Sequence, residues 1–135
     1  MTLIDTNVLI DLATNDAAWA DWSQQKLELA SLQGPLLINE IVYAELSVGF
    51  DQIEELDGFL NGSGIEMHYV SAPALFLAGK AFGQYRRAGG TRSNILADFF
   101  VGAHAVVSRL PLLTRDARKY QTYFPGIELI APPRA

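Results

Sequence analysis

Four acidic residues occupy positions where a folded chain can bring carboxylates together. They are Asp5, Glu45, Asp98 and Asp116. Asp5 closes the apolar run 1–4, Asp98 interrupts an apolar stretch from 95 to 101, and Asp116 follows the strand-like segment 111–115. Carboxylates that converge repel one another unless a cation or a proton neutralises them. The pattern therefore indicates a site for a hard divalent cation.

The chemistry of such a site is hydrolysis. Two unit charges about 4 Å apart repel by about 4 kcal/mol at an effective dielectric constant near 20. Mg²⁺, or alternatively Mn²⁺, relieves this repulsion because both ions prefer oxygen ligands. The bound ion polarises a phosphoryl oxygen and activates a water, and a second ion can hold the leaving oxygen. We expect zinc to be disfavoured, because His68 and His104 stand alone without a histidine at ligand spacing.

Each acid also has an ordinary structural interpretation. Asp5 and Asp116 each suit the N-cap of a following helix or turn, and Glu45 is a mid-helix glutamate that solvent can satisfy. Asp98 has apolar neighbours on all sides, so its alternative is an ion pair with an arginine. The arginines considered for that pair are Arg92 and Arg115. These interpretations, taken one at a time, do not explain all four positions together.

Strand-like and helical segments alternate along the chain. The predicted strands are 2–5, 36–38, 65–70, 111–114 and 127–130. The predicted helices are a start at 8–12, then 16–32, 40–48, 51–60, 72–87 and 94–108, with a helical turn at 116–120. Short strands that are apolar throughout are typical of a parallel sheet covered on both faces. We therefore expect one domain over residues 1–135, an α/β fold of three layers (α/β/α) with about five parallel strands.

This fold class predicts where the acids meet. In open parallel sheets ligands bind beyond the carboxyl ends of the strands. Asp5 and Asp116 fall at or just after such ends, whereas Glu45 and Asp98 must reach the same edge from flanking helices. His104 lies in an apolar helix and is expected to be a hydrogen-bonded core histidine rather than a base.

The net charge of −5 hides an uneven distribution. Residues 80–119 contain eight of the ten lysines and arginines but only two of the fifteen acids. A polyanion is attracted to this segment and repelled by the rest of the chain. The alternative is a helical surface that merely happens to be basic, and composition alone leaves both open.

The cellular compartment is inferred from features that are absent from the sequence. The absence of cysteine excludes disulfides, thiolate zinc sites and cysteine nucleophiles. Met1 leads directly into a strand-like segment without the basic start of a signal peptide, and no apolar stretch reaches the ~18–20 residues of a membrane helix. We therefore expect a cytoplasmic protein that does not enter a membrane.

Four motifs in order resemble the PIN-domain family. They are LIDTNVL at 3–9, VYAEL at 42–46, LADFFVGAHA at 96–105 and LTRDARKY at 113–120. The length and the single domain are similar to the VapC-type toxins of bacterial toxin–antitoxin pairs. The resemblance spans essentially the whole chain, and its first and last motifs are the most specific. The Phe99–Phe100 pair departs from it, because small residues often follow the third acid.

The resemblance implies a metal-dependent ribonuclease that cuts RNA phosphodiester bonds through a metal-activated water. The four acids match the four acidic positions of the family one for one. On this basis Asp5 and Asp98 are expected as direct Mg²⁺ ligands, with Asp116 and Glu45 nearby or acting through water. The polar positions that support the acids correspond to Asn7 and Thr114.

The resemblance also implies partners. A cognate antitoxin protein is expected to block the site, often with a basic side chain near the acids, and the toxin is expected to be a homodimer. Basic residues of the 80–119 segment are the expected contacts with RNA or antitoxin. They are Arg86, Arg87, Arg92, Arg115 and Arg118.

Two other classes remain open. A haloacid-dehalogenase-like phosphatase also starts with an aspartate after an apolar strand, but it needs a second acid two residues later, where this chain has Asn7. A non-catalytic binding module would use the acids structurally and the basic segment for docking nucleic acid or protein. A receiver-type phosphoacceptor is disfavoured because no adjacent acid pair follows the first strand.

Overall fold

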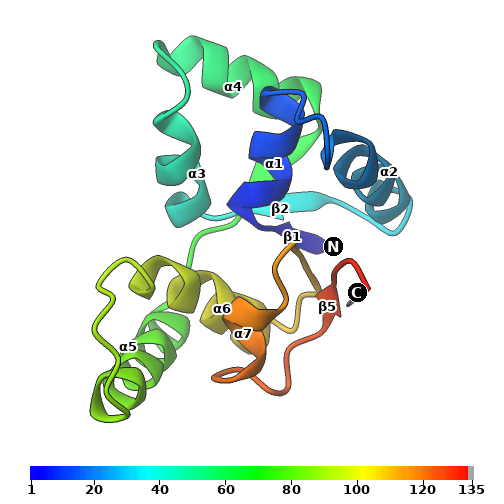
Figure 1. Ribbon diagram of the computed structural model, residues 1–135. Helices are drawn as coiled ribbons and strands as arrows, with labels where there is room; N and C mark the ends of the chain where they lie inside the picture. The colour runs from blue at the N-terminus through cyan, green and yellow to red at the C-terminus, as the bar shows by residue number, and fades with distance from the viewer. Residues whose placement is uncertain (134–135) are drawn as a thin grey trace.

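A computed structural model gives the structure of residues 1–133, in which a parallel sheet is flanked by helices (Figure 1). The strands are β1 (Thr2–Ile4), β2 (Leu36–Ile38), β3 (Ile65–Met67), β4 (Leu112–Leu113) and β5 (Leu129–Ile130). The helices are α1 (Thr6–Ala13), α2 (Ala20–Ser31), α3 (Glu40–Ser47), α4 (Ile53–Gly62), α5 (Ala72–Arg87), α6 (Leu96–Ser108) and α7 (Arg118–Gln121). The predicted three-layer α/β/α architecture is confirmed.

The strand order places β1 at the centre of the sheet. The order is β3-β2-β1-β4-β5, with every neighbouring pair parallel. The chain runs from β1 outward to β3, then crosses to β4 on the other side of β1. Ile4 pairs with Leu113 in register, so the residues that follow these two strands emerge side by side. Ligands of such sheets bind at this kind of switch point.

Several predicted elements are shorter than expected, and the two largest differences have local reasons. The helix predicted from Asp16 begins at Ala20, because the Asp16 carboxylate accepts hydrogen bonds from the backbone N–H groups of Ala18 and Trp19 and holds a turn. The strand predicted to reach Val70 ends at Met67, and the backbone N–H of Val70 instead donates to Glu40. Within residues 1–133, no helix has the length and hydropathy needed to cross a bilayer.

Helices α5 and α6 pack together through small residues (Figure 1), and α6 also contacts α3. A row of alanines on α5 lies against Phe99 and Ala103 of α6. Gly102 of α6 has no side chain because a Cβ there would come within 2.7 Å of the Phe124 ring and 3.1 Å of Tyr120. This close approach brings α6 against the segment containing α7, and with it Asp98, one turn before Gly102.

Candidate active site

Asp5 lies where β1 ends and α1 begins. It is the N-cap of α1, its side chain is buried, and Oδ1 accepts a 2.8 Å hydrogen bond from the backbone N–H of Thr6. Its own backbone N–H donates to the carbonyl of Leu113 in β4. The capping role and the position at the carboxyl edge of the sheet therefore belong to one and the same residue.

The second oxygen of Asp5 collects hydrogen bonds from distant parts of the chain. Oδ2 accepts from the Thr114 hydroxyl at 2.8 Å and from the Tyr120 hydroxyl at 2.6 Å. Thr114 Oγ1 in turn accepts from the backbone N–H of Asp116 at 3.1 Å. The Asn7 amide donates to Thr114 Oγ1 at 3.3 Å and accepts from the backbone N–H of Arg115 at 3.1 Å. Asn7 and Thr114 thus tie the end of β4 to the start of α1.

Asp98 faces Asp5 across a lysine. Lys119 Nζ lies 3.3 Å from Asp98 Oδ1 and 3.7 Å from Asp5 Oδ2. Burial raises the pKa of Asp98, Lys119 lowers it, and the charges of Asp5 and Glu45 raise it, so the net direction is upward. Burial alone would lower the pKa of Lys119, but the surrounding carboxylates raise it above its usual value. The partner of Asp98 is therefore Lys119, not Arg92 or Arg115.

Glu45 and Asp116 stand on the exposed side of this group. The Thr6 hydroxyl donates to Glu45 Oε1 at 2.6 Å, which links α3 to the start of α1. Asp116 is exposed and does not cap α7, whose N-cap is Ala117 without a side-chain bond. Its charge contributes to the raised pKa of Lys119.

The charges of the four acids fall on two adjacent residues, the partly exposed Lys119 and the buried Tyr120. Burial raises the pKa of the Tyr120 hydroxyl well above its usual value, and the charges of Asp5, Asp98 and Glu45 raise it further. Asp5, Asp98 and Asp116 all raise the pKa of Lys119. The structure therefore brings the four predicted residues to one edge of the sheet; we call them, together with Lys119 and Tyr120, the acid centre.

The acid centre fits a hard cation by its chemistry. Its available ligands are carboxylate oxygens, which suit Mg²⁺ or Mn²⁺, and the ammonium of Lys119 already occupies a cation position between Asp5 and Asp98. With the lysine in place, no three His, Asp or Glu side chains within residues 1–133 lie close enough to hold a metal ion. Asp5 and Asp98 are the pair that a cation in the lysine's position would contact.

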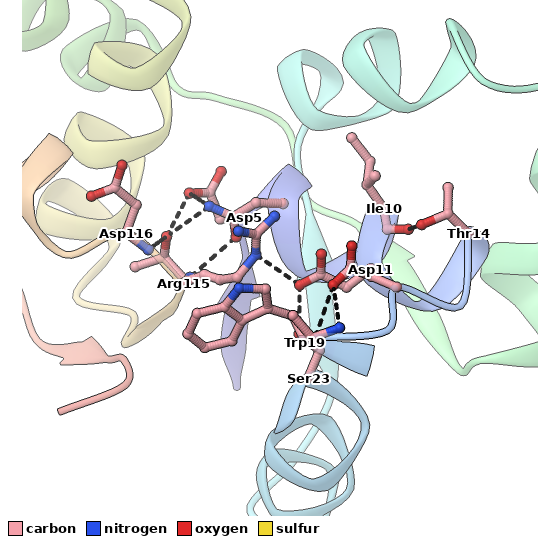
Figure 2. A network of polar contacts seen from close by, with 12 residues as sticks. Asp5, Ile10, Asp11, Thr14, Trp19, Ser23, Arg115 and Asp116 are labelled. Carbon is pink, nitrogen blue, oxygen red and sulfur yellow. Dashed lines mark hydrogen bonds and ion pairs between the residues drawn. The ribbon is translucent and has the colours of Figure 1, made fainter. Parts of the chain in front are cut away.

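A second buried carboxylate, Asp11, was not anticipated. Arg115 Nε lies 2.8 Å from Asp11 Oδ2, and Ser23 donates to the same oxygen at 2.9 Å. Figure 2 shows Arg115 reaching from the side of Asp5 and Asp116 toward Asp11, and its guanidinium lies 5.4 Å from the centre of the Trp19 ring. Arg115, expected as a contact for RNA or antitoxin, is thus engaged inside the protein. The other arginines named for that role are exposed: Arg86, Arg87, Arg92 and Arg118.

The expectation that the two histidines stand alone is wrong. Asn39, the N-cap of α3, accepts from the Val42 N–H and so presents its amide NH₂ to His104 Nδ1 at 3.0 Å. His104 Nδ1 is therefore an acceptor, and the neutral ring carries its proton on Nε2, 2.7 Å from His68 Nδ1. Burial, and then the nearby His68, lower the pKa of His104 to about 4. His104 is the hydrogen-bonded core histidine that was predicted.

An apolar groove opens beside the acid centre. It has a volume of about 490 Å³ and runs between α1 and the end of α3. Its lining includes Thr6, Ile10, Glu45, Leu46, Val48 and Phe50. Ile10 and Val48 are exposed hydrophobic residues, and Glu45 places one site carboxylate at the groove.

The chain matches a known protein family in sequence and several solved structures in fold. The family model described as PIN domain matches residues 2–125. The chain is similar in structure to a chain of VapBC2 from Rickettsia felis bound to promoter DNA, with 22% identity, a TM-score of 0.75 and 98% of both chains covered. It is also similar to VapBC-1 from nontypeable Haemophilus influenzae, with 19% identity, a TM-score of 0.70 and 96% of both chains covered.

A third structure, a toxin–antitoxin complex from Klebsiella pneumoniae, has 23% identity and a TM-score of 0.66, with both chains covered to 100%. At these identities the likeness shows a shared fold. No match was found among curated protein sequences.

Proposed function

The chain belongs to the PIN-domain family, and from this premise we propose that it is a Mg²⁺-dependent endoribonuclease, the toxin of a type II toxin–antitoxin pair. The observation that carries the proposal is the acid centre, in which four carboxylates meet at the switch point of a parallel sheet with one lysine to balance them. Excess negative charge at a ligand-binding edge favours a divalent cation and a polyanionic substrate held through it. Mn²⁺ is the alternative ion.

Each residue of the proposed site has its own role. A bound ion supplies a Lewis acid for the phosphoryl oxygen and an activated water. Asp5 and Asp98 would be the direct ligands of that ion, and Asp116 and Glu45 would act at longer range or through water. The Thr114 and Tyr120 hydroxyls hold the Asp5 carboxylate in one orientation. Asn7 holds the Thr114 side chain and the backbone of residue 115 in place beside that carboxylate through two hydrogen bonds.

Exposed arginines supply contacts with the phosphates of RNA. Arg86 and Arg87 end α5, and Arg92 lies in the loop that follows, where its backbone N–H donates to the Tyr85 hydroxyl. Arg118 is exposed beside Asp116. Cations that neutralise phosphates give sequence-independent, salt-sensitive affinity. These arginines are thus proposed to align the RNA backbone, while the acid centre performs the cleavage.

The antitoxin is proposed to cover the apolar groove. The similar structures from R. felis and H. influenzae are VapBC proteins, and the K. pneumoniae structure is a toxin–antitoxin complex. In this chain the groove presents Ile10 and Val48 to an apolar segment and Glu45 to a basic side chain. One peptide that fills the groove and ends in such a residue would bury the apolar surface and block the acids at once.

We also propose a homodimer that acts in the cytoplasm. Leu75 and Phe76 of α5, with Tyr69 just before it, are exposed hydrophobic residues, and such groups mark interaction surfaces when they are contiguous. Light scattering on the wild-type protein and on Phe76→Glu tests this. Dimeric wild type with a monomeric variant supports this surface, and a wild-type monomer refutes the dimer.

The decisive experiment is cleavage of RNA by the purified chain. We expect cleavage with Mg²⁺ or Mn²⁺, none with EDTA, and none by Asp5→Asn whose circular dichroism matches the wild type. RNA binding without cleavage under either ion would instead favour a binding module. Hydrolysis of phosphomonoesters with intact RNA would favour a phosphatase. In cells, expression of the chain alone should arrest growth, and expression of Asp98→Ala should not.

A further inference from the structure

We propose that Lys119 is a built-in counter-ion that occupies the cation position of the acid centre and must be displaced before a divalent ion binds. The inference rests on the proposed metal dependence and adds to it a barrier supplied by the chain itself. It predicts that metal affinity is held low by this one side chain.

The position of the ammonium is the first observation. Lys119 Nζ lies 3.3 Å from Asp98 Oδ1 and 3.7 Å from Asp5 Oδ2, so it lies between the two carboxylates best placed to share one ion. A Mg²⁺ ion needs oxygens at about 2.0–2.1 Å and cannot share that space with an ammonium. The spacing around the lysine agrees with the absence, within residues 1–133, of any three acids or histidines close enough to chelate.

The second observation is that the Lys119 side chain can move away from Asp5 and Asp98 toward solvent. Its side chain is 29% exposed, whereas that of Asp5 is 2% exposed. The four-carbon stem of a lysine is flexible, and its ammonium is strongly hydrated. Asp116 is exposed and already within electrostatic reach of Lys119, so it offers the displaced ammonium a carboxylate nearer to solvent. Lys119 can therefore leave Asp5 and Asp98 without losing every partner.

Arg115 shows what a permanent counter-ion looks like in the same molecule. It pairs one to one with the buried Asp11, which also accepts from Ser23, and its guanidinium lies over Trp19. That ion pair leaves no surplus charge to attract a cation. Lys119 instead contacts two carboxylates, Asp98 and Asp5, so one ammonium leaves a net negative centre behind. The surplus gives a divalent ion its advantage over the lysine.

The test measures metal binding without RNA. Free Mn²⁺ is followed by electron paramagnetic resonance during titration of wild type, Lys119→Met, Lys119→Arg and Lys80→Met. We expect Lys119→Met to bind Mn²⁺ about ten-fold more tightly than wild type, equivalent to about 1.4 kcal/mol. Lys119→Arg keeps the charge and should bind like wild type. Lys80→Met removes the same charge from α5, where the lysine lies over Phe76, and should change affinity less than about two-fold.

A second measurement uses the wild-type protein alone. Acetylation of lysines, read by mass spectrometry, should rise several-fold at Lys119 when Mn²⁺ is added and stay constant at Lys80. Unchanged Mn²⁺ affinity in Lys119→Met, or unchanged acetylation of a Mn²⁺-loaded wild type, would overturn the counter-ion. Failure of all four proteins to bind Mn²⁺ would overturn the proposed metal dependence and the inference with it.

Discussion

The acid centre and the histidine chain are neighbouring polar clusters built at the same edge of one sheet. The acid centre starts from Asp5 and Thr114, which follow β1 and β4. The histidine chain, which we define as Asn39, His104 and His68, starts from residues that follow β2 and β3. Each contains fully buried side chains, Asp5 and Tyr120 in the first and Asn39 and His104 in the second, and each joins the sheet to α6.

They differ in charge balance. In the histidine chain each donor meets an acceptor in sequence, from the Val42 N–H through Asn39 to His104 and then His68, and the buried His104 is neutral. A neutral, satisfied chain holds elements together and requires no further group. The acid centre gathers four carboxylates around one ammonium. The proposed functional site therefore differs from the histidine chain in its unbalanced charge rather than in burial.

The largest expected effect is on catalysis, in Asp98→Asn. The amide keeps the shape of the side chain but removes one expected ligand and the main partner of Lys119. We expect RNA cleavage to fall by at least about 100-fold, since even the outer-shell partners of metal ligands are worth roughly 10–100-fold. The free energy of unfolding should change by less than about 1 kcal/mol, because the pKa of Asp98 is already raised by burial.

Single-turnover cleavage and urea unfolding on the same preparation measure these two quantities. Arg118→Gln is the matched control, an exposed charge beside Asp116, and it should weaken RNA binding without a comparable loss in the single-turnover rate. If Asp98→Asn lost several kcal/mol of stability but still cleaved RNA, the acid centre would be a structural cluster like the histidine chain.

The converse change is His104→Ala. The side chain is fully buried, and its removal leaves the Asn39 amide without its acceptor and opens a cavity. We expect a loss of about 3 kcal/mol in the free energy of unfolding. Below its melting temperature the variant should cleave RNA within about three-fold of wild type. A much larger loss of cleavage in a folded His104→Ala protein would show that the two clusters are coupled.

Acid should weaken the histidine chain. Burial lowers the pKa of His104 to about 4 in the folded protein, whereas an unfolded histidine takes up its proton near pH 6.5. The unfolded state therefore binds more protons in this window, so the stabilisation is fully present above pH 6.5 and is lost as pH falls toward 4. The two pKa values differ by an amount worth about 3 kcal/mol, and after allowance for solvent screening we expect this residue to account for about 2 kcal/mol of the decline. Urea unfolding at several pH values should show a correspondingly shallower decline in His104→Gln, and an equal decline would refute the assignment.

The smallest effect is expected in Tyr120→Phe. This change deletes the hydroxyl that donates to Asp5 Oδ2 at 2.6 Å and leaves the buried ring in place. We expect a loss of about 1 kcal/mol in the free energy of unfolding and a several-fold loss of cleavage rate, because Asp5 keeps its bonds from Thr6 and Thr114. Tyr123→Phe, outside the acid centre, should leave the cleavage rate unchanged. Equal cleavage by both variants would remove Tyr120 from the positioning of Asp5.

The pattern of apolar and turn residues along the sequence predicts most of the helices and strands, and it predicts that the strands are parallel. Apolar runs without alternation predict a parallel sheet, and the turn residues between them limit each strand to within a few residues of its observed end. The placement of Asp5 and Asp116 at or just after strand ends follows from the same reasoning, because parallel strands share one carboxyl edge. The pattern did not predict where α2 begins or where β3 ends. Each boundary depends on a single side chain, Asp16 or Glu40, that accepts a hydrogen bond from a backbone N–H.

The sequence by itself determined which side chains carry charge, the strands and helices that bear them, and the edge of the sheet to which Asp5 and Asp116 belong. Only the tertiary structure decided the pairings: Lys119 with Asp98 and Asp5, Arg115 with Asp11, and His68 with His104. The reason is physical. Secondary structure follows from neighbours a few residues apart, whereas an ion pair depends on a separation of a few ångströms between distant segments. For Lys119 and Asp98, that separation depends on the close approach of α6 to Tyr120 and Phe124 at Gly102.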